Sequence, residues 1–266
     1  MMQKFVVVAI LLLCVSIHLQ NINCETFFIT RRSNDPSCPG RLTGDPCLTL
    51  SQFMSNIHRI YTSHPNRNPN TTILEIQPGY YNLFERFTVE NIDTFIIRGN
   101  ATIDCNNRQT QRFRNIRSVL ISGLTFASCG QDVFIDEVDQ LVIENSMFRQ
   151  RLRIDDVKIA EIRNTAFLSG TQILYVKDTS ISIQECSFEN NMMGLLAEHS
   201  NVTINRSVFR RNLSPSRYRT FPLLHNVHEG GAIYMIQRFS NRGSMTLAIS
   251  NSEFRDNTVI RSAARG

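Results

Sequence analysis

Three stretches of the chain align without gaps: ISIQECSFENN (residues 181–191), VTINRSVFRRN (residues 202–212) and LAISNSEFRDN (residues 247–257). Each contains an apolar residue, an isoleucine two positions later and a phenylalanine five positions after the isoleucine. The isoleucine column continues toward the N-terminus through Ile97, Ile121, Ile143 and Ile162. Successive isoleucines are 24, 22, 19, 21, 21 and 45 residues apart. A repeat of about 21 residues is therefore the main feature of this sequence.

The columns of the repeat predict how the chain turns. Residues two apart on a strand face the same way, so the isoleucine and the apolar residue before it point into one core. An offset of five is odd, so the phenylalanine reaches that core only if the chain bends. Five of the seven residues two positions after the isoleucine are Gly or Asn, which best tolerate the left-handed conformation of a tight bend. In the first repeat, Thr102 stands in the phenylalanine column.

This period favours one fold class. It is too short for a unit of strand, helix and strand, and a β-propeller blade needs about 40–45 residues. We predict an all-β fold, a parallel β-helix over residues 71–266, and the crossover preference makes the coil right-handed. The 45-residue step indicates one coil with about 24 inserted residues, mostly between Asn212 and Gly230. Because no capping helix follows Asn257, we expect a truncated piece of a longer protein.

The N-terminal residues differ from the repeat. Phe5 to Val15 is an uninterrupted apolar run, too short for a ~30 Å hydrocarbon core but typical of a secretory signal peptide. We expect a signal peptide over residues 1–24, no membrane span in the mature chain and a secreted or cell-surface location. Residues 25–48 are rich in turn formers and are predicted to be irregular. Apolar residues at helical spacing from Leu50 to Tyr61 predict one amphipathic helix, with Thr49 or Ser51 as N-cap. Residues 25–70 would then form a cap.

Cysteines and glycosylation triplets agree with export. Cys105 and Cys129 each lie eight residues after a column isoleucine, so adjacent coils place them within disulfide distance. Cys38 and Cys47 flank a turn-rich segment and would pair locally, which leaves Cys186 reduced. The alternative is that Cys24 survives cleavage and pairs with another cysteine. Asn-x-Ser/Thr triplets, candidates for glycosylation, begin at Asn70, Asn100, Asn201, Asn205 and Asn212.

Two short motifs resemble a known superfamily. The segments FENN (188–191), FRRN (209–212) and FRDN (254–257), with GGAI (230–233), resemble the repeats of right-handed β-helix proteins of the pectin-lyase-like superfamily, especially the polymorphic outer membrane protein type. The segment from Cys38 to Phe53 resembles the N-terminal cap of large secreted β-helix proteins of simple animals. The resemblance covers residues 38–257. It implies the fold, while the superfamily holds both enzymes and adhesion ectodomains.

Candidate catalytic residues are few. Polygalacturonase-like members carry an Asn-Thr-Asp motif, but Ala166 follows Asn164-Thr165 here. Asp155 and Asp156 are a pair of carboxylates, yet adjacent strand residues point to opposite faces. We find no outward carboxylate cluster across consecutive coils, so no catalytic residue is predicted. An enzyme, a polysaccharide lyase or glycosidase, is the alternative function.

Binding is the first hypothesis. Arg149, Arg151 and Arg153 alternate and could present one face to an acidic glycan, although a solvated strand face explains them about as well. The net charge of +5 is too small to indicate nucleic-acid binding. His225, His228 and Glu229 lack a third anchored ligand, so neither a metal nor a cofactor is expected. We therefore expect a non-catalytic β-helix ectodomain for adhesion, with an extracellular glycan or protein partner.

Overall fold

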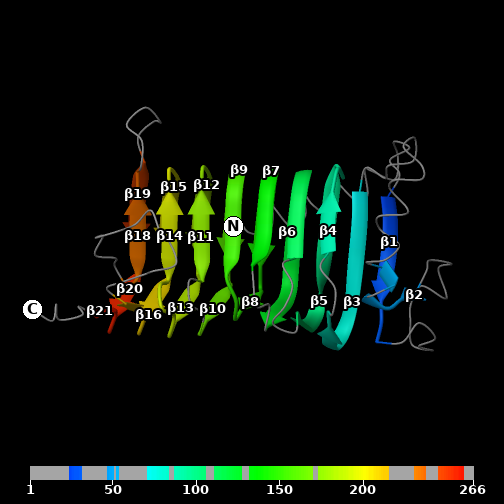
Figure 1. Ribbon diagram of the computed structural model, residues 1–266, viewed down its shortest axis with the longest axis horizontal. Coiled ribbons are helices and arrows are strands. Elements are labelled where there is room, and N and C mark those ends of the chain that lie inside the picture. Colours follow the sequence, from blue (N-terminus) through cyan, green and yellow to red (C-terminus); the bar gives the residue numbers. More distant parts are fainter. Residues whose placement is uncertain are drawn as a thin grey trace, which may run out of the picture.

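The computed structural model describes residues 24–31, 47–50, 52–53, 71–83, 87–105, 111–127, 132–169, 173–215, 231–237 and 245–260. Its strands stack side by side along the long axis as an all-β parallel solenoid (Figure 1). The strands are β1 (Cys24–Ile29), β2 (Cys47–Leu48), β3 (Thr71–Asn82), β4 (Phe87–Glu90), β5 (Thr94–Asp104), β6 (Gln111–Ala127), β7 (Val133–Glu144), β8 (Met147–Phe148), β9 (Leu152–Arg163), β10 (Ala166–Leu168), β11 (Leu174–Lys177), β12 (Ser180–Gln184), β13 (Ser187–Glu189), β14 (Leu195–Glu198), β15 (Asn201–Asn205), β16 (Val208–Arg210), β17 (Leu213–Pro215), β18 (Ile233–Ile236), β19 (Thr246–Ser250), β20 (Glu253–Arg255) and β21 (Thr258–Ile260).

The repeat alignment is confirmed by the strand register. Each strand pairs in parallel with its equivalent one coil away, and the isoleucine column is the seam of this pairing. The partners run from Ile97 through Ile121, Ile143, Ile162, Ile183 and Ile204 to Ile249. Identical side chains therefore stack on one another along the axis, and the repeat period defines the coil.

The phenylalanine column forms one stack through the core. The rings of Phe126, Phe148, Phe167, Phe188, Phe209 and Phe254 follow one another with centroids 4.4 to 5.5 Å apart and planes within 15° of parallel. The first five are fully buried. The chain therefore bends between the isoleucine and the phenylalanine, as the odd offset requires.

The prediction for Thr102 is wrong, because β5 contains a bulge. Between β5 and β6 the register shifts at Arg98/Ala101, so two residues of β5, Gly99 and Asn100, oppose Gly123 alone. One extra residue reverses the inward and outward phase of the rest of the strand. Ile103 consequently pairs with Phe126 and is buried in the core.

Each coil has three corners, of which the repeat pattern indicated one. Among the described residues, the fifteen non-glycine residues with positive φ fall into three columns along the axis. The first corner comprises Asn91, Asn115, Glu137, Asp156, Asp178 and His199; the second Asn145, Asn164, Glu185, Arg206 and Asn251; the third Ser169, Asn190, Arg211 and Asp256. Gly123 continues the second corner with φ 70°, and a Cβ there would lie 2.1 Å from the Gly99 carbonyl oxygen. Glycine is therefore required at that position.

Buried polar side chains satisfy the backbone behind all three corners, as Thr179 does behind the first, where its hydroxyl accepts a bond from the Val157 N–H (3.1 Å). Behind the second corner, the Ser207 hydroxyl accepts a bond from the Cys186 N–H (3.2 Å) and donates to the Asn205 carbonyl oxygen (3.0 Å). Behind the third corner, Asn212 Nδ2 donates to the Phe188 carbonyl oxygen (2.9 Å), and Asn212 Oδ1 accepts from the Asn191 N–H (3.2 Å). The asparagines of the Phe-x-x-Asn motif thus connect adjacent coils.

This ladder contradicts the prediction of a glycan at Asn212. The residue is fully buried, and Asn257 Oδ1 accepts a further bond from its amide nitrogen at 2.9 Å. A sugar on that nitrogen would have to occupy the core and displace the ladder, so the folded solenoid excludes it.

Two described parts of the N-terminal segment are strands, while residues 32–46, which contain its turn formers, lie outside the described residues. Residues 25–48 include β1 and β2, and β1 lies between β2 and β3. Leu50 and Phe53 are buried, and the Phe53 ring packs 5.2 Å from that of Phe27. Thr49 and Gln52 exchange side-chain to backbone bonds of 3.2 and 2.8 Å, which form a capping box.

A helical cap nevertheless stays a prediction. Leu50, Gln52 and Phe53 have helical backbone, and the rest of the expected helix lies outside the described residues. Residues 1–23, which include nearly all of the expected signal peptide, also lie outside them. Within the described part of the chain, no helix has the length and apolarity needed to cross a bilayer.

The insertion is divided into two parts. Leu195 pairs with Ile233, a step of 38 residues, which is 17 more than the 21 that separate Leu174 from Leu195. Asn201 pairs with Thr246, a step of 45, so seven further residues follow β18. Just before β18, the backbone at Gly231 packs closely against the backbone at Asn212. A Cβ at Gly231 would lie 2.5 Å from the Asn212 carbonyl oxygen, so the close packing requires glycine.

The cysteine predictions are only partly within the described chain. Cys105 is fully buried and disulfide-bonded. Cys38 and Cys129 lie outside the described residues, as does the side chain of Cys47, so both pairings stay predictions. Cys186 is a free, buried thiol in the hydroxyl column behind the second corner.

The phenylalanine stack predicts the effect of truncation. Phe188→Ala removes a fully buried ring between two stacked neighbours, and we expect a loss of about 3–5 kcal/mol in the free energy of unfolding. Ser182→Ala, an outward change on β12, should alter it by less than about 0.5 kcal/mol. Urea denaturation followed by circular dichroism measures both, and equal losses would contradict the coil assignment.

The thiol of Cys186 should be inert. Burial raises its pKa to about 11, and its Sγ donates to the Gln184 carbonyl oxygen at 3.2 Å. Because the thiolate is the reactive form, iodoacetamide at pH 8 should leave Cys186 unmodified until the protein is denatured. Peptide mapping detects the label. Cys186→Ser should fold normally, since the hydroxyl residues Thr165 and Ser207 occupy this column in the adjacent coils, and rapid labelling of Cys186 in the native protein would refute the assignment.

Candidate functional site

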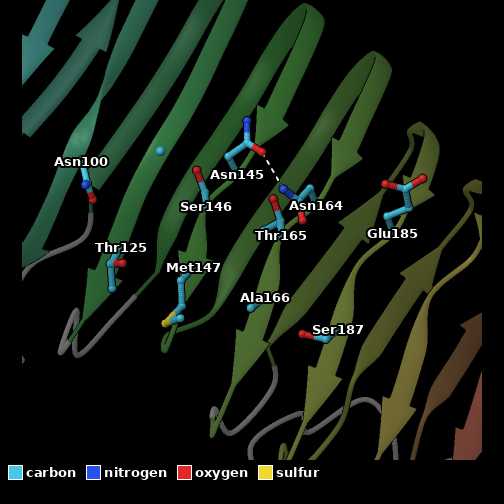
Figure 2. Close-up of a pocket in the computed structure, with 11 residues that line it drawn as sticks. Asn100, Thr125, Asn145, Ser146, Met147, Asn164, Thr165, Ala166, Glu185 and Ser187 are labelled. Atoms are coloured by element: carbon cyan, nitrogen blue, oxygen red, sulfur yellow. Dashed lines mark hydrogen bonds between the residues drawn. The ribbon is translucent and has the colours of Figure 1, made fainter. Parts of the chain in front are cut away.

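A groove follows the second corner of the solenoid along its axis. We call it the axial groove; it encloses about 310 Å³. Figure 2 shows its lining residues, which come from successive coils. They are Asn100, Gly123, Thr125, Asn145, Ser146, Met147, Asn164, Thr165, Ala166, Glu185 and Ser187.

The coil geometry explains why this corner is hollow. Asn145, Asn164 and Glu185 occupy the left-handed corner positions and are exposed. The next residue of each coil turns inward to bond the backbone, as Thr165 does to the Arg163 carbonyl oxygen at 2.9 Å. The following strand then opens with a half-buried side chain that contributes little bulk in the later coils, Ala166 and Ser187. Each coil thus adds one wall residue and one floor residue, about 4.8 Å from the last.

The amides of the groove wall offer both a hydrogen-bond donor and a hydrogen-bond acceptor. Asn164 Nδ2 donates to Asn145 Oδ1 at 2.6 Å, the contact drawn in Figure 2. Asn145 Nδ2 and Asn164 Oδ1 have no partner among the described residues, so one donor and one acceptor remain for a ligand. Such paired capacity suits hydroxyl groups, which both donate and accept.

The groove is almost uncharged. Glu185 is its one ionisable lining residue, and Arg206 Nη1 donates to Glu185 Oε1 at 3.2 Å. Hydrolysis with two carboxylates across a glycosidic bond needs a second acid about 5–9.5 Å away. The lining supplies none, so the arrangement suits binding of a neutral polar ligand.

The predicted arginine face is a different surface, and two of its three members are neutralised. Arg151 makes a bidentate pair with Asp132 at 2.5 and 2.9 Å, and Arg153 Nη2 lies 2.9 Å from Asp155 Oδ2. Arg149 is exposed. These pairs consume the charge that an acidic glycan would need, so the structure does not bring together a free arginine face.

A second hollow lies beside it, at the first corner. This charged pocket encloses about 570 Å³ and is lined by Arg112, Arg114, Phe134, Asp136, Glu137, Asp155, Asp156, Lys177 and Asp178. No local sequence motif indicated this pocket. Asp136 and Asp155 are partners in the strand register of adjacent coils. They are 19 residues apart, as are Ile143 and Ile162, so alignment on the isoleucines already placed the two aspartates side by side.

The opposite placement expected for Asp155 and Asp156 is also wrong. Asp156 is a first-corner residue with φ 53°, so the alternation of a straight strand does not apply to it. Both carboxylates therefore line the charged pocket.

The two strand carboxylates of this pocket, Asp136 and Asp155, each pair with a cationic side chain. Arg112 reaches both oxygens of Asp136, at 2.9 and 2.5 Å, and Lys177 Nζ lies 3.5 Å from Asp155 Oδ1. The Arg112 and Arg153 guanidiniums also stack on the Phe134 ring, at 4.8 and 4.6 Å. This surface is a ladder of paired charges and rings across coils, in which Arg153 Nε is buried without a hydrogen-bond partner among the described residues.

Tyr175 ends the ladder. Arg153 lies 5.2 Å from its ring, and its hydroxyl donates to Glu198 Oε2 at 2.9 Å. Burial, followed by the bond to Glu198, raises the pKa of Tyr175 well above its usual value. The phenol therefore stays protonated and acts as a hydrogen-bond donor within the fold.

The remaining glycosylation triplets differ in access. Asn100 is exposed and lines the axial groove, Asn201 is exposed on β15, and Asn205 is half-buried beside it. Asn70 lies outside the described residues, as do His225, His228 and Glu229. Among the residues that the structure describes, no group of three or more His, Cys, Asp or Glu could hold a metal ion.

No protein-family model, curated protein or solved structure matches this chain.

The charged pocket predicts an unequal response to two similar substitutions. Asp136→Asn leaves the partly buried Arg112 without its bidentate partner and should lower the free energy of unfolding by about 1–3 kcal/mol. Asp139→Asn removes an exposed pair with Lys158 and should cost less than about 1 kcal/mol. Thermal and urea denaturation compare the two variants, and an equal effect would show that the ladder contributes no stability.

Proposed function

We propose that this protein is a secreted or cell-surface, non-catalytic β-helix ectodomain of the pectin-lyase-like type that binds an extended, uncharged glycan in the axial groove. The observation that carries the proposal is the pair of corner amides on adjacent coils, Asn145 and Asn164, which lie in one groove with the side chains of Thr125 and Ser187. A polysaccharide presents hydroxyl groups, which both donate and accept, so the unpaired donor and acceptor of these amides match it.

An extended polypeptide is a poorer match. Peptide recognition by strand addition needs an open sheet edge. The strands that floor the groove, β8, β10 and β13, each pair with a neighbouring coil on both sides. The groove also crosses the strands instead of following them, so its contacts come from side chains.

Export is supported by two further features. The apolar run from Phe5 to Val15 has the length of a signal-peptide core. Cys105 is disulfide-bonded, and such bonds persist in oxidising compartments. Glycan binding, adhesion and an extracellular partner are mutually consistent.

The alternative, a polysaccharide lyase or glycosidase, draws on the charged pocket. Its five carboxylates include Asp136 and Asp155 on adjacent coils, the outward cluster that such an enzyme needs. The cations that hold both residues explain why we favour binding. Incubation with polygalacturonate and with neutral polysaccharides, followed by assays for new reducing ends and for unsaturated products, tests this directly. Product formation that Asp155→Asn abolishes would replace our proposal.

The binding test uses two matched substitutions. Asn164→Gly removes a groove amide but retains the left-handed corner, because glycine adopts positive φ freely. Asn190→Gly makes the same change at an exposed third-corner residue outside the groove. Affinity electrophoresis in gels containing a β-glucan, a mannan or polygalacturonate should show retardation by a neutral polymer.

Asn164→Gly should weaken that retardation about five- to tenfold, corresponding to ~1 kcal/mol for a lost hydrogen bond, whereas Asn190→Gly should not. Retardation by polygalacturonate alone, or equal effects of the two substitutions, would refute the assignment of the groove.

A further inference from the structure

The axial groove begins at a glycosylation triplet. Asn100-Ala101-Thr102 supplies the acceptor, and Asn100 lines the groove at its N-terminal end. The β5 bulge explains this position: Gly99 and Asn100 oppose a single residue of β6. Bulges re-aim side chains, and here the extra residue directs Asn100 outward, where it is exposed.

The path from Asn100 along the groove is open. The next corner residue is Gly123, which has no side chain, and beyond it lie the amides of Asn145 and Asn164. Figure 2 shows Asn100 well separated from Asn145 on the same side of the coils. A group attached to Asn100 Nδ2 can therefore extend across Gly123 toward the amide wall without meeting another corner side chain.

We propose that the chain's own N-linked glycan on Asn100 occupies the axial groove and limits access to it. The inference rests on the proposed function, because it requires export and a groove that accepts neutral sugars. The transfer forms a bond between Asn100 Nδ2 and the anomeric carbon of a lipid pyrophosphate-linked oligosaccharide; the amide loses one proton and the lipid pyrophosphate leaves. The first sugars of such a chain are uncharged and carry hydroxyl and acetamide groups, which suits the wall.

Asn201 provides a matched control on the same molecule. It is also exposed and begins an Asn-x-Thr triplet, but it lies on β15, and its Oδ1 accepts a bond from the Thr246 N–H at 3.1 Å. It does not line the groove. A glycan at Asn201 would extend from an open strand face into solvent, so the two sites differ in surroundings and not in exposure or triplet type.

The first experiment compares release of the two glycans. Protein secreted from a eukaryotic host is treated with peptide N-glycosidase in its native state, and site occupancy is followed by peptide mass mapping. Release at Asn100 should be about tenfold slower than at Asn201, equivalent to about 1.4 kcal/mol of protection. After denaturation the two rates should be equal. An unmodified Asn100, or native release as fast as that at Asn201, would overturn the inference.

The second experiment measures access. Thr102→Ala abolishes the Asn100 triplet, Thr102→Ser retains it, and Asn201→Gln removes the control glycan. Thr102→Ala should increase retardation in β-glucan or mannan gels about tenfold, and the other two variants should leave it unchanged. Equal retardation of Thr102→Ala and Thr102→Ser in a neutral polymer that binds would overturn the inference and leave the proposed function intact. Slow release at Asn100 with no retardation of any variant would support the position of the glycan and overturn the proposed function.

Discussion

The structure depends on parallel strand pairing in which each residue lies beside the equivalent residue of the next coil. Each residue stacks on its own equivalent, so every column must tolerate its own kind as a neighbour. Aromatic rings satisfy this condition by parallel stacking, as from Phe126 to Phe254. Primary amides satisfy it as well, because each has a donor and an acceptor. The Asn191 and Asn212 ladder is the buried result.

Charged residues can occupy equivalent positions of adjacent coils only when residues of opposite charge lie next to them, because like charges would repel. On the first face, Arg114 and Lys177 stand at the two sides of Asp136 and Asp155, so that each carboxylate has a cation one coil away. The charges are consumed within the fold, which leaves little to attract an acidic partner. The second corner instead carries mostly neutral side chains, and for that reason its groove has hydrogen-bonding capacity to offer.

The sequence was sufficient to predict the features that follow from the repeat of about 21 residues. The solenoid class, the isoleucine seam and the buried phenylalanines all follow from column alignment, because a repeat that stacks in register needs no further information. Local insertions were not predictable in the same way. A single extra residue at Asn100 moved Thr102 out of phase, and the bulge leaves no mark in composition.

The corners account for most of what the sequence did not indicate. Glu137, Glu185 and Arg206 adopt positive φ although their residue types do not favour it, because the stacked coils impose the turn on them. Reasoning from straight strands therefore separated Asp155 from Asp156, which share a pocket. The sequence did not indicate the axial groove for a related reason: its successive corner residues lie 19 to 23 positions apart and form no local motif.

The buried amide of Asn212 makes the order of biosynthetic events matter. In an exported chain its triplet would be open to oligosaccharide transfer only before folding, because the ladder that buries it forms when β16 and its neighbours dock. In an exported chain, folding and modification then compete for one nitrogen atom. Occupancy at Asn212 would therefore report the relative rates of these two events. A sugar at Asn212 would mean that oligosaccharide transfer preceded docking of the coil, and an unmodified Asn212 would mean that docking came first.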